Sequence, residues 1–274
     1  MQSKRKYYLK IVAVAIFLVC INTYVLTRTQ EIASALDKGT LVVGMELKFP
    51  PFETMDEKGN PMGVSVDLAQ AIGEVLGVDV VIKSVDYQGL IPALQSHNID
   101  LILSSMTVTD ERLKSINFSE EYARSDLGLA LHKSVDINGY EELNSANYTI
   151  AVKQGNLAES WAEANLPNAT IKQFSEVSAA MLDVNNGASH AFIYDPLSLI
   201  EASSNLTQTK LLLTPLPGVK GWGIGMRKND EKLLEEVNSA LAQIKASGFF
   251  DEMRQKYLKE EVEKYESYGL QYFF

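Results

Sequence analysis

The sequence predicts an α/β protein with two lobes, each a mostly parallel sheet flanked by helices, and a cleft between the lobes. First, short apolar runs rich in β-branched residues alternate with amphipathic helical segments, which is typical of parallel sheets with right-handed crossovers. Second, a new series of such segments begins near Leu127. Third, an apolar run at 222–226 follows that series and returns to the first. The chain is therefore expected to cross between the lobes twice.

The first series opens with a predicted strand at 41–44 and a helix bounded by Ser65 as N-cap and Gly77 as the terminating residue. Apolar side chains recur between these two residues at helical spacing, which favours one buried face. The remaining elements of this series are predicted as strands at 78–85 and 99–103 and a helix around Pro92.

The second series has the same alternation. Its strands are predicted at 127–131, 148–152 and 191–194, and its helices at 157–165 and 177–185. After the returning strand at 222–226, the chain is expected to end in helices. We therefore divide it into lobe 1 (36–124 and 222–262), lobe 2 (125–221) and an aromatic-rich tail (263–274). For residues 260–274, a helical extension of lobe 1 and a disordered tail both stay open.

Residues 1–35 have the features of an export signal. Basic residues at 4–6 and 10 precede the apolar run 11–26, and a small-x-small site follows at Ala33-Ser-Ala35. The run is also near the lower length limit for a membrane-spanning helix. Two alternatives stay open, a signal cleaved at Ala35 and an anchor retained at 11–26. In both, the basic flank stays inside, so the protein is expected in the periplasm or on the outer face of the plasma membrane.

The charge and the cysteine content exclude several classes of protein. Residues 36–274 carry 20 basic and 34 acidic side chains, a net charge of −14. Such a surface repels polyanions, which argues against nucleic-acid binding. The single cysteine, Cys20, lies in the leader, where lipidation would need a small residue in place of Val19. The three histidines are scattered without a second ligand at metal spacing, so we expect no metal site and no cofactor.

Several segments in order along the chain resemble one known family. They are Gly-Val-Ser-Val-Asp-Leu-Ala-Gln-Ala-Ile at 63–72, Phe-Pro-Pro-Phe at 49–52, Tyr-Gln-Gly-Leu-Ile-Pro-Ala-Leu at 87–94, Asp-Leu-Ile-Leu-Ser-Ser-Met-Thr-Val-Thr-Asp-Glu-Arg at 100–112, Ala-Val-Lys-Gln-Gly at 151–155 and Tyr-Asp-Pro at 194–196. Over 37–260 the chain is similar to the family 3 extracytoplasmic solute-binding proteins, and most of all to those that bind glutamine. The resemblance implies the type II periplasmic-binding-protein fold, with the ligand in the cleft between the lobes.

Two charged residues suit a free amino acid. Arg112 can bind a carboxylate through two parallel hydrogen bonds, and it follows a strand-to-helix turn. Asp195 ends a predicted strand, the edge at which ligands collect in open α/β sheets, although it could equally be the N-cap of the next helix. The resemblance puts Arg112, with Thr107 and Ser105 beside it, on the ligand α-carboxylate and Asp195 on its ammonium.

The resemblance also assigns the residues around the ligand side chain. Phe49 and Tyr87 match the aromatic positions that enclose it, although both could simply be core residues. Glu46, Lys153 and Tyr194 fall at positions that set specificity, and together they favour a polar, glutamine-like side chain. Glu46 and Lys153 could instead pair with each other. The family often has glycine at position 105, where this chain has serine.

The predicted function is capture of a free polar amino acid outside the plasma membrane and its delivery to the permease of an ABC importer, by a monomer without enzymatic activity. A ligand-sensing domain for a separate signalling partner is one alternative. A dehydratase-type enzyme on the same fold is the other, and it would need a proton-transfer residue in the cleft.

Overall fold

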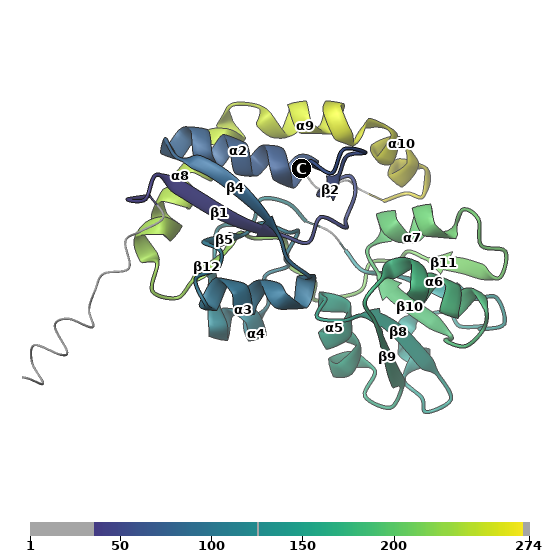
Figure 1. The fold of residues 1–274 in the computed structure, drawn as a ribbon. Helices are drawn as coiled ribbons and strands as arrows, with labels where there is room; N and C mark the ends of the chain where they lie inside the picture. The colour runs from purple at the N-terminus through teal and green to yellow at the C-terminus, as the bar shows by residue number, and fades with distance from the viewer. Residues whose placement is uncertain (1–35, 125, 271–274) are drawn as a thin grey trace, which may run out of the picture.

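The computed structural model describes residues 36–124 and 126–270. The predicted leader and the possible anchor at 11–26 lie outside the described residues. Two five-stranded sheets form the centres of two lobes, which lie side by side in Figure 1. Within the described ranges, no helix is both long and apolar enough to cross a membrane.

The first sheet has the strand order β4-β1-β5-β12-β6. Its strands are β1 (Thr40–Met45), β4 (Asp79–Ser84), β5 (Leu101–Ile102), β6 (Ile116–Phe118) and β12 (Gly225–Arg227). The second sheet has the order β11-β7-β10-β8-β9. Its strands are β7 (Gly128–His132), β8 (Thr149–Lys153), β9 (Thr170–Phe174), β10 (Ala191–Tyr194) and β11 (Thr209–Leu212). A small hairpin joins β2 (Thr54–Met55) to β3 (Pro61–Met62).

Both sheets are mostly parallel, as predicted, and each contains one strand that runs against the others. β1 is parallel to β4 and β5, but β12 is antiparallel to β5 and β6. In the second sheet β8 is parallel to β9 and β10, but β7 is antiparallel to β10 and β11. The strands β7 and β12 are the first that the chain enters after each crossing between the lobes. They enter their sheets from the cleft side, so they run against the parallel strands.

Helices cover both faces of each sheet (Figure 1). The helices of the first lobe are α2 (Val64–Leu76), α3 (Leu90–Gln95), α4 (Asp110–Ser115), α8 (Glu231–Ala246), α9 (Phe249–Tyr257) and α10 (Lys259–Ser267). Those of the second lobe are α5 (Leu157–Asn165), α6 (Val177–Asn185) and α7 (Pro196–Ser203), and single 3₁₀ turns lie at η1 (Tyr87–Gly89) and η2 (Tyr140–Leu143). Alternate residues of β1 explain the two faces. Leu41 and Val43 pack in the core with α2 and α8, while Val42 contacts the core with α3.

The N-cap of helix α2 lies two residues before the predicted one. Its N-cap is Gly63, with φ 121°, and a Cβ at this position would lie 2.4 Å from the carbonyl oxygen of Phe52. Ser65 is therefore inside the helix, where its hydroxyl donates to Glu53 instead of capping the backbone. The other end is as predicted, since Gly77 takes the left-handed conformation at the C-terminus.

In its described part, up to Leu270, the C-terminal tail begins as a helix, in agreement with the alternative of a helical extension. α10 continues to Ser267, and Tyr265 is buried with α7 residues Leu197 and Ile200 in the core of the first lobe. α10 and α7 lie next to each other in Figure 1. This segment therefore adds an apolar contact between the lobes.

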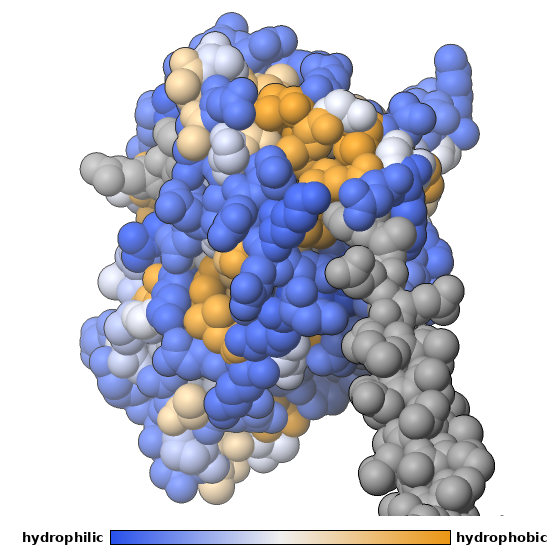
Figure 2. All heavy atoms as spheres, turned by 90° about the vertical axis from the view of Figure 1, so that its left-hand side faces the viewer, coloured by the Kyte–Doolittle hydropathy of each residue, from blue (hydrophilic) through white to orange (hydrophobic). Residues whose placement is uncertain are grey.

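The surface is mostly hydrophilic on the face drawn in Figure 2, with apolar side chains in separate patches. The exposed large apolar residues of the described chain are Met55, Met62, Val75, Val81, Leu182 and Tyr268.

Candidate functional site

A cavity lies between the lobes. From the first lobe it is lined by Phe49, Glu53, Ser104, Ser105, Thr107 and Trp222. From the second lobe it is lined by Asp126, Leu127, Asn156, Leu157, Tyr194 and Asp195. These residues come mainly from loops at strand ends, because the ends of β5, β8 and β10 converge on the cleft. We call this space the main cavity.

One wall of the main cavity is aromatic. Phe49 stacks on Phe52 with ring centroids 5.0 Å apart, and Trp222 packs edge-on against both rings. Tyr194 from the second lobe approaches Phe49 edge-on at 6.4 Å. Trp222 also makes backbone bridges to Thr107 and to the crossing segment. This wall can enclose the apolar part of a small ligand.

Asp195 follows β10 and serves as the N-cap of α7. Its Oδ1 accepts the backbone N–H of Ser198 at 2.9 Å, as the capping alternative expected. Its Oδ2 is buried and has no hydrogen-bond partner in the described chain. Burial raises the pKa of the Asp195 carboxyl to about 6. One oxygen thus stabilises the helix, and the other is available to a donor in the cavity.

We expect Asp195→Asn and Asp195→Ala to separate these two roles. Asparagine caps as well as aspartate, whereas alanine is expected to cost about 1 kcal/mol of stability. The raised pKa means that the folded state binds this proton more tightly than the unfolded state does. The resulting contribution of Asp195 to the stability of the fold is complete below its ordinary pKa of 3.8 and is lost as the pH rises through about 6. Urea unfolding should therefore show the asparagine variant gaining stability relative to the wild type between pH 4 and pH 7. Equal pH profiles would contradict this assignment.

Glu53 is a second buried carboxyl in the main cavity, and sequence reasoning did not identify it. It is 1% exposed. Its Oε2 accepts the hydroxyls of Ser65 at 2.6 Å and Ser105 at 2.9 Å, and its Oε1 accepts the hydroxyl of Ser104 at 3.0 Å. Burial raises the pKa of the Glu53 carboxyl to about 7, against the opposing effect of the three hydroxyls.

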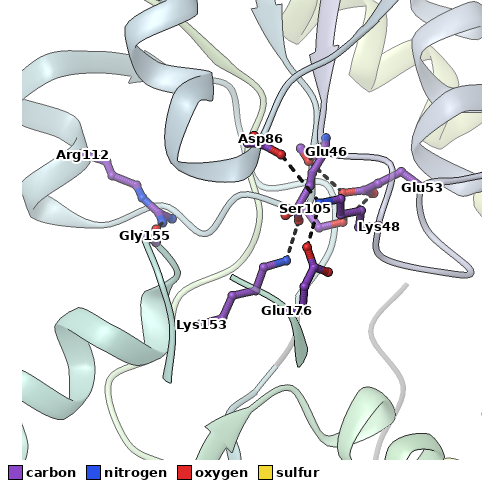
Figure 3. A network of polar contacts seen from close by, with 10 residues as sticks. Glu46, Lys48, Glu53, Asp86, Ser105, Arg112, Lys153, Gly155 and Glu176 are labelled. Carbon is purple, nitrogen blue, oxygen red and sulfur yellow. Dashed lines mark hydrogen bonds and ion pairs between the residues drawn. The ribbon is translucent and has the colours of Figure 1, made fainter. Parts of the chain in front are cut away.

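Glu46 and Lys153 form a buried ion pair between the lobes (Figure 3). Lys153 Nζ lies 2.6 Å from Glu46 Oε2, and the two side chains are 5% and 6% exposed. Both residues line a second cavity, together with Tyr87. The Lys153 ammonium lies 5.7 Å from the centre of the Tyr87 ring. At the rim of this cavity Lys48 bridges to Glu176 of the second lobe at 2.9 Å. The alternative in which Glu46 and Lys153 pair with each other is thus the observed arrangement.

Arg112 lies apart from this cluster in Figure 3. Its guanidinium donates to the backbone carbonyl of Thr107 at 2.7 Å and to that of Gly155, in the second lobe, at 3.0 Å. It lies 5.8 Å from the centre of the Tyr87 ring. Thr109 caps α4 by accepting the backbone N–H of Arg112, which fixes where the side chain starts. Arg112 thus bridges the lobes at the edge of the cleft and does not line either cavity.

The predicted site residues are therefore divided between two neighbouring spaces. Those lining the main cavity are Phe49, Ser105, Thr107, Tyr194 and Asp195. Those lining the second cavity are Glu46, Tyr87 and Lys153. The lining residues that the prediction omitted include Glu53, Ser104 and Asn156. Each lies within or directly beside a quoted segment, but its residue type alone does not indicate that it faces a cavity.

No group of three or more His, Cys, Asp or Glu side chains in the described ranges could hold a metal ion. The arrangement offers instead free acceptor atoms, aromatic faces and two interlobe charge contacts. These features suit noncovalent binding of a small polar molecule.

The comparisons with known proteins agree with the fold. The chain is 26% identical over 230 residues to the L-cystine-binding protein TcyJ of Escherichia coli (strain K12), which covers 83% of this chain and 86% of the relative. It is 26% identical over 239 residues to the ABC transporter glutamine-binding protein GlnH of Bacillus subtilis (strain 168), which covers 86% and 87%. An ancestral arginine-binding protein bound to arginine superposes with a TM-score of 0.70 at 34% identity, which covers 80% of this chain and 98% of that one. Residues 41–260 match the bacterial extracellular solute-binding proteins, family 3, and the chain belongs to that family.

Proposed function

We propose that this protein captures a free polar amino acid outside the plasma membrane and delivers it to an ABC importer without changing it chemically. The observation that carries the proposal is the main cavity between the lobes, where the free Oδ2 of Asp195 can accept an ammonium. The names of the relatives support amino-acid binding, and GlnH is named as part of an ABC transporter.

The ligand is proposed to join the two lobes. Its ammonium would contact Asp195 of the second lobe, and its carboxylate would contact Arg112 of the first. Arg112 has five N–H donors, and two of them are used in hydrogen bonds to backbone carbonyls. A ligand bound to both lobes stabilises the closed state because it loses its contacts to one lobe when the lobes separate.

Glutamine is the proposed ligand among the polar amino acids. A carboxamide both donates and accepts, so it can contact a carboxylate and an ammonium held side by side, as Glu46 and Lys153 are. A cationic side chain would have to tolerate Lys153 and an anionic one Glu46, each at a cost in a dry site. The ligand side chain would enter between these two residues or replace their direct contact.

A thermal-shift screen against the twenty standard amino acids tests this proposal. A ligand that binds only the folded state is expected to add about 2.7 kcal/mol at 100 times its Kd, which is a Tm increase of several degrees. We expect the largest increase with glutamine. An increase with a different amino acid would keep the receptor function and correct the ligand. No increase with any of the twenty, on protein shown to be free of bound ligand, would contradict amino-acid capture.

A further inference from the structure

Glu53 lines the main cavity, and the hydrogen bonds from its described neighbours leave one acceptor position of its carboxyl unused. An ionised carboxylate has about four acceptor positions on its two oxygens. Ser65 and Ser105 donate to Oε2 and Ser104 donates to Oε1, so three are used. The fourth, on Oε1, holds the proton when Glu53 is neutral and can accept a donor when it is ionised.

Glu53 also decides what Ser105 can do. The Ser105 hydroxyl donates its hydrogen bond to Glu53, so toward the cavity it can only accept one. Ser105 has φ 46°, a left-handed conformation that is uncommon for serine and places this side chain over the carboxyl. Ser105 and ionised Glu53 therefore offer acceptors at this wall of the cavity, which suits a ligand donor.

The charge around this wall of the cavity is negative. The described residues that line the main cavity include three carboxyls and no Lys, Arg or His. Four titratable groups interact electrostatically with Glu53. They are Glu46 after β1, Tyr87 in η1, Tyr122 beyond β6 and Tyr194 at the end of β10. Helix α2 presents only the Ser65 hydroxyl.

The basic side chains of the cleft contact groups other than Glu53. Burial raises the pKa of Asp195, and the charge of Lys153 opposes this. Lys153 pairs with Glu46, Lys48 pairs with Glu176, and Arg112 donates to two carbonyls. Nothing in these contacts gives Glu53 a cationic partner. A positively charged group that enters the main cavity would be the first to meet this carboxyl.

We propose that Glu53 is part of the ammonium subsite, with Asp195 from the second lobe, and that the ligand ammonium replaces a proton held by Glu53. This inference rests on the function proposed above. In this step the neutral carboxyl loses its proton to solvent, and an N–H···O hydrogen bond from the ammonium takes the open position on Oε1. Burial supports the step, since it raises the pKa of Glu53 to about 7 and that of Asp195 to about 6. Near neutral pH the unliganded site therefore still holds protons.

Calorimetric titration of the protein in phosphate and in Tris, whose ionisation enthalpies differ, measures the protons released on binding. The probes are L-glutamine and any other standard amino acid that raises the Tm in the screen. At pH 7 we expect proton release, seen as a buffer-dependent binding enthalpy. We expect affinity to fall as the pH drops from 7.5, approaching about tenfold per pH unit for each proton displaced. Binding with a buffer-independent enthalpy at pH 7 and flat affinity would overturn this inference and leave the proposed function standing.

Two variants show whether Glu53 is the source of the proton. Glu53→Gln is expected to remove the pH dependence near 7 and to leave only that of Asp195, below about pH 6. Ser65 does not line the cavity, and its hydroxyl stabilises the ionised form of Glu53. Ser65→Ala should therefore raise the pKa of Glu53 and move the onset of proton release to higher pH. A merely structural role for Glu53 predicts no such movement.

The matched control is Glu201→Gln on α7. Burial raises the pKa of Glu201 also, but this residue does not line the main cavity. We expect the control to release the same number of protons as the wild type. Loss of release in the control as well would contradict the assignment to Glu53. Failure of every amino acid to raise the Tm would instead contradict the proposed function, and the inference with it.

Discussion

Lys153→Met is expected to favour separation of the lobes in the unliganded protein. The substitution leaves Glu46 at 6% exposure without its cation while the lobes stay together. Removing one partner of a buried ion pair typically costs about 3–5 kcal/mol. Glu46 can escape this cost by hydration when the lobes separate, so the loss should appear mainly in the closing equilibrium and less in unfolding. A change of that size corresponds to more than a hundredfold in the ratio of closed to open protein.

Small-angle X-ray scattering of the unliganded protein measures this shift as an increase in the radius of gyration. Lys48→Met is the matched control, because Lys48 also bridges the lobes but its side chain and that of Glu176 are about half exposed. Exposed pairs contribute about 0–1 kcal/mol, so the control should stay close to the wild type. The double variant Glu46→Leu with Lys153→Met removes both charges and should restore closure. An unchanged radius in Lys153→Met would show that the buried pair does not hold the lobes together.

Arg112→Ala is expected to weaken binding of the amino acid found in the screen by about 30-fold to several thousand-fold. The range follows from the roughly 2–5 kcal/mol that truncation of one partner of a buried, hydrogen-bonded charge pair costs. Alanine also removes the hydrogen bond that joins the guanidinium to Gly155, so closure loses a contact in addition to the ligand carboxylate. Arg112→Lys keeps the charge but loses the two-pronged geometry, and it should bind with intermediate affinity.

Isothermal titration calorimetry measures this loss, with Arg124→Ala as the control. Arg124 lies at the crossing between the lobes and donates to the carbonyl of Val219. Arg112 instead donates to Thr107, which lines the main cavity, and to Gly155, which adjoins the lining residue Asn156. We expect the control to bind like the wild type. Equal affinities of Arg112→Ala and Arg124→Ala would contradict the assignment of the ligand carboxylate to Arg112.

The Glu46–Lys153 ion pair and the hydrogen bonds of Glu53 show which features of the site could not be predicted from the sequence. The pairing of Glu46 with Lys153 was one of two open alternatives, because residues 107 positions apart give no local signal of their distance. The role of Ser65 was predicted wrongly. A serine near the start of a helical pattern is usually a cap, but Gly63 can approach the backbone of Phe52 more closely and takes that position.

The antiparallel direction of β7 and β12 also could not be read from local sequence patterns. Alternation of strands and helices predicts parallel neighbours correctly for β1 with β4 and β5 and for β8 with β9 and β10. It does not report the direction in which a strand enters a sheet after a long crossing. β7 and β12 enter against their neighbours, and only the packing of the two lobes determines this.

The sequence by itself determined the α/β class, the order of most elements, the family, and the position of Asp195 at the end of a strand. These features depend on local periodicity and on motifs of a few residues. They can therefore be predicted without knowing which distant residues are in contact. The tertiary structure alone decided that Glu46 and Lys153 meet, that Arg112 bridges to Gly155, and that Glu53 is buried under three serine hydroxyls. The physical reason is desolvation. The charge state and the partners of a buried group depend on which distant segments exclude water from it, and that is known only once the lobes are packed together.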